Sequence, residues 1–413
     1  MPIKSALSRF AKFLLPPVLY ARLQALYSQI AHPLGTAALP EKSLEAWDVY
    51  LQDPRMDSRL RSMLTGFIEK NEATMMSAYW SVLCRKNVAQ LLDMKYENFK
   101  QTVALNYFTW LVGEEDPQAV FLFKNLPDEV IDAAKRRVDE LPSHNFMTKE
   151  QSAFFNMMTY LLWDYTERTV GTELLRQLEE PLEGNPPSFQ LSGKTISQDL
   201  ANSVLEYHSV AGGFPNIDSL KTIMELGGGY GRTAYVFLRM MPQVRYVMVD
   251  IPPALYIAER YLTGQFPDRK AFRYRSFGRF TEIEEEFRQS NLAFFMPDQL
   301  ELLPENMTDL FMAIDCLHEM RPEQIKRYFM TIDRLSSYLY QKCWKTTMIP
   351  YDNITLTQND YPFLPNWQNL FFRDCKVQST YFEALFRIEK PQEAQRDSAA
   401  KEKPHEKELS HHE

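Results

Sequence analysis

The sequence predicts an α/β fold in which a mostly parallel sheet with an antiparallel end follows an all-helical N-terminal domain. Two patterns support this prediction. From about residue 41 to 180, apolar residues recur three and four positions apart, which is the spacing of amphipathic helices. From residue 220 onward, short continuous apolar runs alternate with stretches that fit helices, which is typical of a parallel sheet covered on both faces.

Length and composition limit the classes of protein to which the chain can belong. Its 413 residues are too many for one ordinary core, and its 45% hydrophobic and 24% charged residues indicate a globular protein. A net charge of -8 argues against a nucleic-acid partner, because phosphate backbones are bound by clustered Lys and Arg. No apolar run reaches the roughly 20 residues that cross a bilayer. Four widely spaced cysteines favour free thiols in a reduced cytoplasm.

The N-terminal segment, residues 1–40, begins with "MPIKSALSRFAKFLLPP". Its apolar residues follow one helical stripe, and Lys and Arg lie beside it. Such a stripe suits a helix on a membrane surface, or a helix packed on the body of the protein or on a partner. We therefore expect a cytoplasmic protein in which residues 1–17 could make a peripheral contact with a membrane surface.

The helical domain is predicted over residues 41–180, and its tryptophans are expected to pack in a core or to line a pocket. A boundary follows in "EEPLEGNPPSFQLSGKTISQDL", which is rich in Pro and Gly. Within it, Thr195-x-x-Gln198 fits a capping box that opens the next helix, and roles in function stay open for Gln198, Asp199 and Asn202.

The second domain is predicted over residues 181–389, and the charged tail at 390–413 is expected to be disordered. The runs "KTIMEL", "RYVMVD", "LAFFM", "DLFMAID" and "SYLYQK" are its expected strands. The segment "LFFRDCKVQSTYFEALFRI" reads as two more strands with little between them, which predicts an antiparallel pair that closes the sheet.

A glycine-rich turn follows the first of these strands, in "TIMELGGGYGRTAYVFLRM". It leaves a predicted strand and opens a predicted helix, which is the context in which such a turn holds a nucleotide. Gly227, Gly229 and Gly231 allow torsions and a close ligand approach that a Cβ would block. The next strand ends at Asp250, 19 residues after Gly231, where an acid can accept hydrogen bonds from both hydroxyls of a ribose.

The glycine spacing separates two classes of cofactor. A dinucleotide turn has the pattern G-x-G-x-x-G, but Arg232 stands at its last position when counting starts from Gly227. The glycines fit E-x-G-x-G-x-G instead, with Glu225 at the strand end, which is the pattern of class I S-adenosylmethionine-dependent methyltransferases. A carboxylate there suits a ligand with an ammonium and a sulfonium group and would repel a pyrophosphate. We therefore predict S-adenosylmethionine as the cofactor, with the binding residues Glu225, Gly227, Gly228, Gly229, Tyr230, Gly231, Asp250 and Ile251.

Further along, Met296, Asp298 and Gln299 follow the third strand, where the adenine of that cofactor would lie. An apolar side chain can stack on the base while a polar one reads its amino edge. An ordinary loop explains the same three residues equally well.

The fourth strand is followed by the predicted catalytic residues Asp315, His318 and Glu319. A hydroxyl becomes a good methyl acceptor when a base removes its proton, and a His with a pKa near ~6.5 can do this at neutral pH. A carboxylate could orient the ring or take the proton itself. The same residues could instead serve the N-terminus of the helix near Pro322. Asp315 and Glu319 could hold Mg²⁺, but two acids make a partial site, so no metal site is assigned.

These motifs together resemble the bacterial sugar O-methyltransferase family over about residues 180–388. The resemblance is carried by "EEPLEGNP", "ISQDLANSVLEY", "ELGGGYGRTAYVFL", "YVMVDIPPALYIAERYL", "DQLELLPENMTDLF", "LHEM" and "WKTTMIPYDN…DYPFLPNW" in this order. It implies a Rossmann-like class I methyltransferase domain with a seven-stranded sheet. It also implies transfer to a sugar hydroxyl in polysaccharide or lipopolysaccharide assembly. The segment "LHEM" is similar to the "LHDW" of small-molecule O-methyltransferases, whose His acts as the base.

The acceptor would then be a nucleotide-sugar, a glycan end or a lipid-linked glycan. Aromatic faces suit the C–H surfaces of sugars, and the candidates for this contact are Trp344, Tyr351, Tyr361 and Trp367. Three other functions stay open: methyl transfer to a phenol or another small metabolite, a scaffold that retains the fold, and an NAD-dependent oxidoreductase, which the glycine spacing opposes. The sequence predicts no oligomeric state.

Overall fold

The computed structural model describes residues 45–70, 76–103, 116–144 and 147–390. The expectations for residues 1–40 and for the tail after residue 390 lie outside this part of the chain. None of the helices within it is long and apolar enough to span a bilayer.

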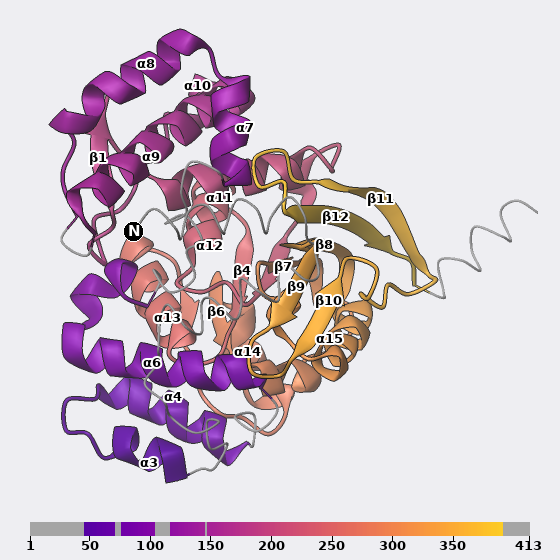
Figure 1. The fold of residues 1–413 in the computed structure, drawn as a ribbon. Coiled ribbons are helices and arrows are strands. Elements are labelled where there is room, and N and C mark those ends of the chain that lie inside the picture. The colour runs from indigo at the N-terminus through magenta and orange to yellow at the C-terminus, as the bar shows by residue number, and fades with distance from the viewer. Residues whose placement is uncertain (1–44, 71–75, 104–115, 145–146, 391–413) are drawn as a thin grey trace, which may run out of the picture.

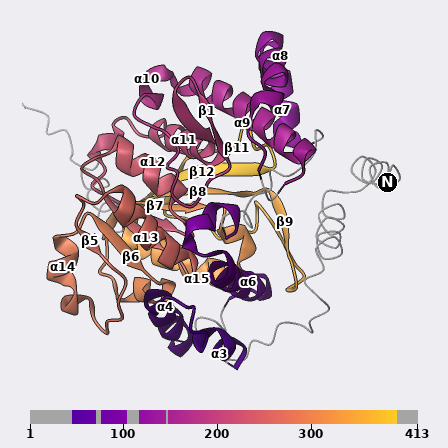
Figure 2. The ribbon, with the colours of Figure 1, turned by 90° about the vertical axis from the view of Figure 1, so that its left-hand side faces the viewer.

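An eight-stranded sheet forms the centre of the second part of the chain, in the order β11-β12-β8-β7-β3-β4-β6-β5. Figure 2 shows this order from β11 at the top to β5 at the lower left. The strands are β3 (Thr222–Leu226), β4 (Arg245–Val249), β5 (Ala271–Phe272), β6 (Leu292–Phe295), β7 (Thr308–Ile314), β8 (Ser336–Trp344), β11 (Trp367–Asp374) and β12 (Tyr381–Ile388). The strands from β8 to β5 run parallel to their neighbours, whereas β12 is antiparallel to both β8 and β11. From β11 to β6 this is the strand order of the class I methyltransferase fold, so the predicted fold class is confirmed.

The central strands are apolar throughout because both of their faces are covered. In β3, Ile223 packs in one cluster of buried side chains, and the next residue, Met224, packs in a second cluster on the opposite face. The first cluster includes residues of α11 (Gln198–Ala211), α12 (Arg232–Met240) and α13 (Ala254–Gln265). The second includes residues of α14 (Glu284–Arg288) and α15 (Pro322–Leu335).

In the described residues up to 180, all regular secondary structure is helical, with turns and irregular segments between the helices. Figure 1 shows two groups of helices, one at the upper left and one at the lower left of the sheet. Their bounds are α3 (Glu45–Leu51), α4 (Ser58–Glu69), α6 (Ala78–Met94), α7 (Pro117–Asn125), α8 (Asp128–Arg137), α9 (Lys149–Val170) and α10 (Thr172–Leu175). The first apolar cluster extends from Trp47 in α3 to Leu385 in β12, so both parts of the chain share one packing region. We propose residues 41–180 and 181–389 as the two domains.

The segment between the two parts is more ordered than its Pro and Gly content predicts. It contains a hairpin of β1 (Ser188–Leu191) and β2 (Lys194–Ser197). The capping box expected at Thr195 is wrong, because Thr195 lies in β2 and its hydroxyl accepts a hydrogen bond from Gln190 Nε2. Ser197 caps α11 instead, and its Oγ accepts from the backbone N–H of Leu200 at 3.0 Å. A further hairpin, β9 (Thr346–Ile349) with β10 (Ile354–Thr357), lies between β8 and β11 in the chain.

Candidate active site

The glycine turn connects β3 to α12 and has a backbone that side chains rarely allow. Gly227, Gly229 and Gly231 have φ values of 69°, 60° and 91°. A Cβ on Gly227 would lie 2.5 Å from the Cβ of Cys316, whereas a Cβ on Gly229 would have no atom within 4 Å. Gly227 is therefore required by packing and Gly229 by its torsion, and the space beside Gly229 is open for a ligand.

Glu225 is the last residue but one of β3, just before this turn, and is 1% exposed. The hydroxyl of Tyr246, on the neighbouring strand β4, donates a 2.8 Å hydrogen bond to its Oε2. Burial raises the pKa of Glu225 to about 7, although the hydrogen bond from Tyr246 acts in the opposite direction. The carboxyl is thus poised to become charged when a cationic group approaches.

Asp250 follows β4 and is bonded directly to the glycine turn. Its Oδ2 accepts the backbone N–H of Gly229 at 2.8 Å, and its Oδ1 accepts that of Ile251 at 2.7 Å. Burial raises the pKa of Asp250 to about 7 despite these two hydrogen bonds. Each carboxylate oxygen keeps a second lone pair for a ligand hydroxyl.

One cavity brings most of the predicted cofactor-binding residues together with one of the predicted catalytic residues. Its empty volume is about 1260 Å³, including open solvent at its mouth. The predicted residues that line it are Glu225, Gly227, Gly228, Gly229, Tyr230, Asp250, Ile251 and Asp315. Gly231 does not line it, because that residue caps α12 with its φ of 91° and packs on Leu262.

The three adenine candidates do not line this cavity. Pro297 does so instead, at the start of the 3₁₀ turn η6 (Pro297–Leu302). Met296 and Gln299 are 1% and 2% exposed, and the Gln299 side chain is used locally. It accepts the Met296 N–H at 2.9 Å and donates to the carbonyl of Arg275 at 2.8 Å. Asp298 lies outside the lining as well, and burial raises its pKa.

Asp315, His318 and Glu319 form a cluster behind the end of β7. Asp315 reaches the cavity, while His318 is 4% exposed and lies behind it. His318 Nε2 is 3.6 Å from Asp315 Oδ1 and 3.9 Å from Glu319 Oε1. Burial lowers the pKa of His318, although Asp315 opposes the shift, so the ring is neutral at pH 7. Burial and the charge of Asp315 raise the pKa of Glu319.

The N-terminal helices form one wall of the cavity, which sequence reasoning predicted only in general terms. Met76, Ser77 and Trp80, at the start of α6, line it. Trp80 Nε1 donates a 3.0 Å hydrogen bond to Glu319 Oε2. Asp352, in the turn between β9 and β10, accepts the backbone N–H of Ala78 at 2.6 Å. These contacts join segments more than 200 residues apart, so no local motif could have indicated them.

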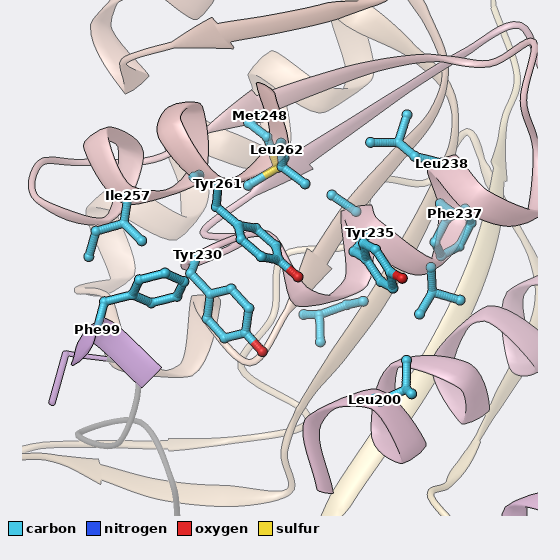
Figure 3. Close-up of a cluster of buried hydrophobic side chains, with 14 of the residues drawn as sticks. Phe99, Leu200, Tyr230, Tyr235, Phe237, Leu238, Met248, Ile257, Tyr261 and Leu262 are labelled. Carbon is cyan, nitrogen blue, oxygen red and sulfur yellow. The ribbon is translucent and has the colours of Figure 1, made fainter. Parts of the chain in front are cut away.

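Helix α11 forms another wall, through Asp199 and Asn202. The hydroxyl of Tyr230, in the glycine turn, donates to Asp199 Oδ2 at 2.6 Å. Burial raises the pKa of Asp199 to about 6, against the opposing charge of Arg232. Figure 3 shows the Tyr230 ring beside Phe99 and Tyr261, so the turn is packed against both parts of the chain.

None of the four aromatic acceptor candidates lines the cavity. Tyr361 and Trp367 are 5% and 7% exposed and pack on Phe329 of α15, so they belong to the core. The Trp344 ring packs against Tyr381, which does line the cavity. The aromatic residues of the lining are Trp80, Tyr230, Tyr328 and Tyr381. Tyr351 lies in the turn between β9 and β10, with a φ of 66°.

Tyr381, at the start of β12, connects Trp344 with the cluster. Burial raises the pKa of Tyr381, and so does the negative charge of the nearby Asp315. The rings of Trp344 and Tyr381 are 5.3 Å apart. Within the described residues, no group of three or more His, Cys, Asp or Glu side chains is arranged to hold a metal ion.

No protein-family model and no curated protein matches the sequence. Solved structures match parts of it. A SAM-dependent methyltransferase from Aquifex aeolicus is 13% identical, with a TM-score of 0.29 over 44% of this chain and 89% of that one. Human N-acetylserotonin methyltransferase is 14% identical, with a TM-score of 0.29 over 58% of this chain and 70% of that one. TnmH is 13% identical, with a TM-score of 0.32 over 46% of this chain and 57% of its own length. Because these scores are low, we identify the fold from the strand order and infer no activity from the names.

Proposed function

We propose that the protein is an S-adenosylmethionine-dependent O-methyltransferase that acts on a sugar hydroxyl. The observation that supports this most strongly is that Glu225, Gly229 and Asp250 face the same cavity as Asp315. The first three offer two carboxyl groups and an open space beside a backbone that has no Cβ. Asp315 offers a hydrogen-bond acceptor where the methyl acceptor would lie.

The cavity lining fits the proposed cofactor in its chemistry. Glu225 would face the cationic end of the cofactor, and Asp250 would accept hydrogen bonds from its ribose hydroxyls. Ile251 and Pro297 provide apolar surface for its base. When bound, S-adenosylmethionine would supply a methyl group on a cationic sulfur, which is a good leaving group for transfer to an oxygen.

The remaining lining supports a polyhydroxylated acceptor. It combines planar amide and carboxylate side chains with aromatic rings: Asp199, Asn202, Asp315, Gln324 and Gln378 with Trp80, Tyr328 and Tyr381. Amides and carboxylates can bond two neighbouring hydroxyls at once, and aromatic faces suit the C–H surfaces between them. A wholly apolar acceptor would cover these polar groups without offering them hydrogen-bond partners.

The chain's own residues would position the hydroxyl and accept its proton. Asp315 accepts a hydrogen bond from the acceptor hydroxyl and takes the proton as the new O–C bond forms. Burial keeps His318 neutral, and its Nε2 lies 3.6 Å from Asp315 Oδ1. The ring would therefore serve as a second proton acceptor. Trp80 would orient the carboxyl group of Glu319 by donating a hydrogen bond to it, and Tyr381 lines the cavity near Asp315.

Two experiments test the proposal in sequence. Calorimetry should show binding of S-adenosylhomocysteine and none of NAD; the reverse result would reject the cofactor. Transfer of labelled methyl groups should then be measured with panels of nucleotide-sugars, oligosaccharides and phenols. Labelling within the sugar panels is the expected result. Labelling of phenols alone would replace the sugar assignment with the small-molecule alternative, and no labelling at all would favour a scaffold.

A further inference from the structure

A second cavity adjoins the candidate active site. It lies between helices α9 and α11 on one side and strands β8, β11 and β12 on the other, where the antiparallel end of the sheet meets the N-terminal helices (Figure 1). Its empty volume is about 890 Å³, including open solvent at its mouth. None of the predicted cofactor or catalytic residues lines it.

The two cavities share a boundary. Asn202 and Gln378 line both of them and are 6% and 9% exposed. Gln378 is also tied to the reaction centre, because its carbonyl accepts the backbone N–H of Tyr381 at 2.8 Å. The backbone N–H of Asp315 donates to the carbonyl of Lys342 at 2.8 Å, and the Lys342 side chain lines the second cavity. A molecule whose hydroxyl lies at Asp315 would therefore enter the second cavity by passing Asn202 and Gln378.

The second cavity carries an excess of positive charge. Lys342, Arg373 and Lys376 line it, against the carboxylates of Glu206 and Glu383. Arg373 Nε is 2.7 Å from Glu383 Oε1, so the net excess is one positive charge, and Lys376 carries it at the exposed side of the cavity. His208 adds no charge at pH 7, since burial and the nearby Lys376 and Arg373 lower its pKa.

The carboxylate of Glu206 is shared between two cations, which leaves part of their charge uncompensated. Lys342 Nζ is 2.8 Å from its Oε1, and Arg232 Nη1 is 2.6 Å from its Oε2. Burial would raise the pKa of Glu206, but these two charges outweigh it and lower the pKa to about 2. Buried positive charge of this kind attracts an anion, because little water is present to screen it.

We propose that the second cavity binds an anionic group of the acceptor, a phosphate ester or a carboxylate. This inference rests on the proposed function, since it places the acceptor's hydroxyl at Asp315 in the adjoining cavity. It narrows the acceptor from any sugar to one that carries negative charge near the methylated ring, such as a sugar phosphate, a nucleotide-sugar or a uronic acid. Arg373 and Lys376 would contact the anion, and Asn202 and Gln378 would bond the part of the molecule that passes between them.

The test uses the full chain saturated with S-adenosylhomocysteine, at constant ionic strength. Calorimetry is performed with glucose, glucose 1-phosphate, glucuronic acid and inorganic phosphate. We expect at least one anionic probe to bind, and its affinity to fall about tenfold in Lys376→Gln and in Arg373→Gln, as loss of a charged hydrogen-bond partner requires. Preference for glucose 1-phosphate would assign a phosphate ester, and preference for glucuronic acid a carboxylate.

The matched control is Lys326→Gln, which removes the same charge from an exposed position on α15 that lines neither cavity. Its anion affinity should equal that of the unaltered protein. An equal loss in Lys326→Gln, or no anion binding stronger than that of glucose, would overturn the proposal. Failure of the unaltered protein to bind S-adenosylhomocysteine would instead reject the proposed function, so the two failures are distinguishable.

Discussion

Asp315 has a backbone conformation that is unusual for a residue with a side chain. Its φ of 57° lies in the left-handed region, at the point where β7 ends. Asp and Asn tolerate this region better than most residues because their short polar side chains can bond nearby backbone groups. With this backbone conformation, the Asp315 side chain is 34% exposed and lines the cavity, whereas His318, three residues later, is buried.

This arrangement gives a prediction for three variants. Asp315→Asn should keep the backbone conformation and lower turnover at least ~100-fold, the usual scale for loss of a general base. His318→Ala should lower turnover less, because the ring lies behind Asp315. Binding of S-adenosylhomocysteine should change little in either variant. Asp315→Ala should lose the same turnover and should also lower the free energy of unfolding by ~1–2 kcal/mol, because alanine tolerates the left-handed conformation less well. Thermal unfolding would detect this loss of stability. Normal turnover in Asp315→Asn would remove Asp315 from the mechanism.

Glu225 and Asp250 give a prediction for pH. Burial raises the pKa of each to about 7, so a large share of both carboxyls is protonated at pH 6 in the absence of ligand. The ammonium group of the ligand favours the charged form of Glu225, and ribose hydroxyls that donate to Asp250 favour the charged form of that residue, so binding must release protons below pH 7. The affinity for S-adenosylhomocysteine should therefore rise several-fold between pH 6 and pH 8, at up to ~10-fold per pH unit for each proton released.

Calorimetry in buffers of different ionisation enthalpy would count these protons. Asp250→Asn should bind more weakly and release fewer protons, whereas a flat pH profile in the unaltered protein would contradict the role given to the two acids.

At the scale of the element, the turn between β3 and α12 combines two demands on glycine. Gly227 packs on Cys316 beneath the turn, whereas Gly229 faces the cavity and donates its N–H to Asp250. Both have positive φ, but the surroundings of a new Cβ differ completely between them.

A matched pair of variants separates these demands. Gly229→Ala should fold with a loss of ~1–2 kcal/mol from its torsion and should weaken S-adenosylhomocysteine binding, because the methyl group would occupy ligand space. Gly227→Ala should destabilise the protein further, because its Cβ would lie 2.5 Å from that of Cys316. Denaturation and calorimetry on both variants provide the check. Full cofactor affinity in a folded Gly229→Ala would show that the ligand lies elsewhere.

The elements of the sheet and the glycine turn could be predicted because their signals are local. Glu225, Gly229 and Asp250 lie within one strand, turn, helix and strand, where spacing alone fixes their relation. Trp80 and Asp199 could not be assigned to the cavity in this way, because their places depend on how α6 and α11 pack on the sheet. Tyr361 and Trp367 show the opposite error: aromatic composition suggested a pocket, but packing against Phe329 placed them in the core.

At the scale of the whole molecule, a buried ion pair joins the N-terminal helices to the glycine turn. Lys100, in η1 (Tyr96–Gln101), is 1% exposed and pairs with Glu180. Its Nζ lies 5.1 Å from the ring centre of Tyr230. Glu180 in turn accepts a 2.6 Å hydrogen bond from Ser197, the cap of α11. One cation thus holds together a helical segment, the cap of α11 and a residue of the glycine turn.

Removing that cation should destabilise the whole molecule. Lys100→Met leaves the carboxylate of Glu180 buried without its partner, which costs ~3–5 kcal/mol in comparable pairs. Adding Glu180→Gln should recover part of this loss. Lys124→Met, at an exposed position of α7, is the matched control and should stay within ~0.5 kcal/mol of the unaltered protein. Urea denaturation would compare the three, and equal stability of Lys100→Met and the control would exclude the role given to the pair.

The position of β12 has a consequence for synthesis of the protein. β12 lies between β8 and β11, although it follows both in the chain. Among the described strands, β11 pairs with β12 alone, so β11 has no place in the sheet until β12 has left the ribosome. The same late segment supplies Gln378 and Tyr381 to the cavity. A nascent chain therefore carries the glycine turn long before it carries all the residues of the cavity, which is complete only after translation has passed β12 at residue 388.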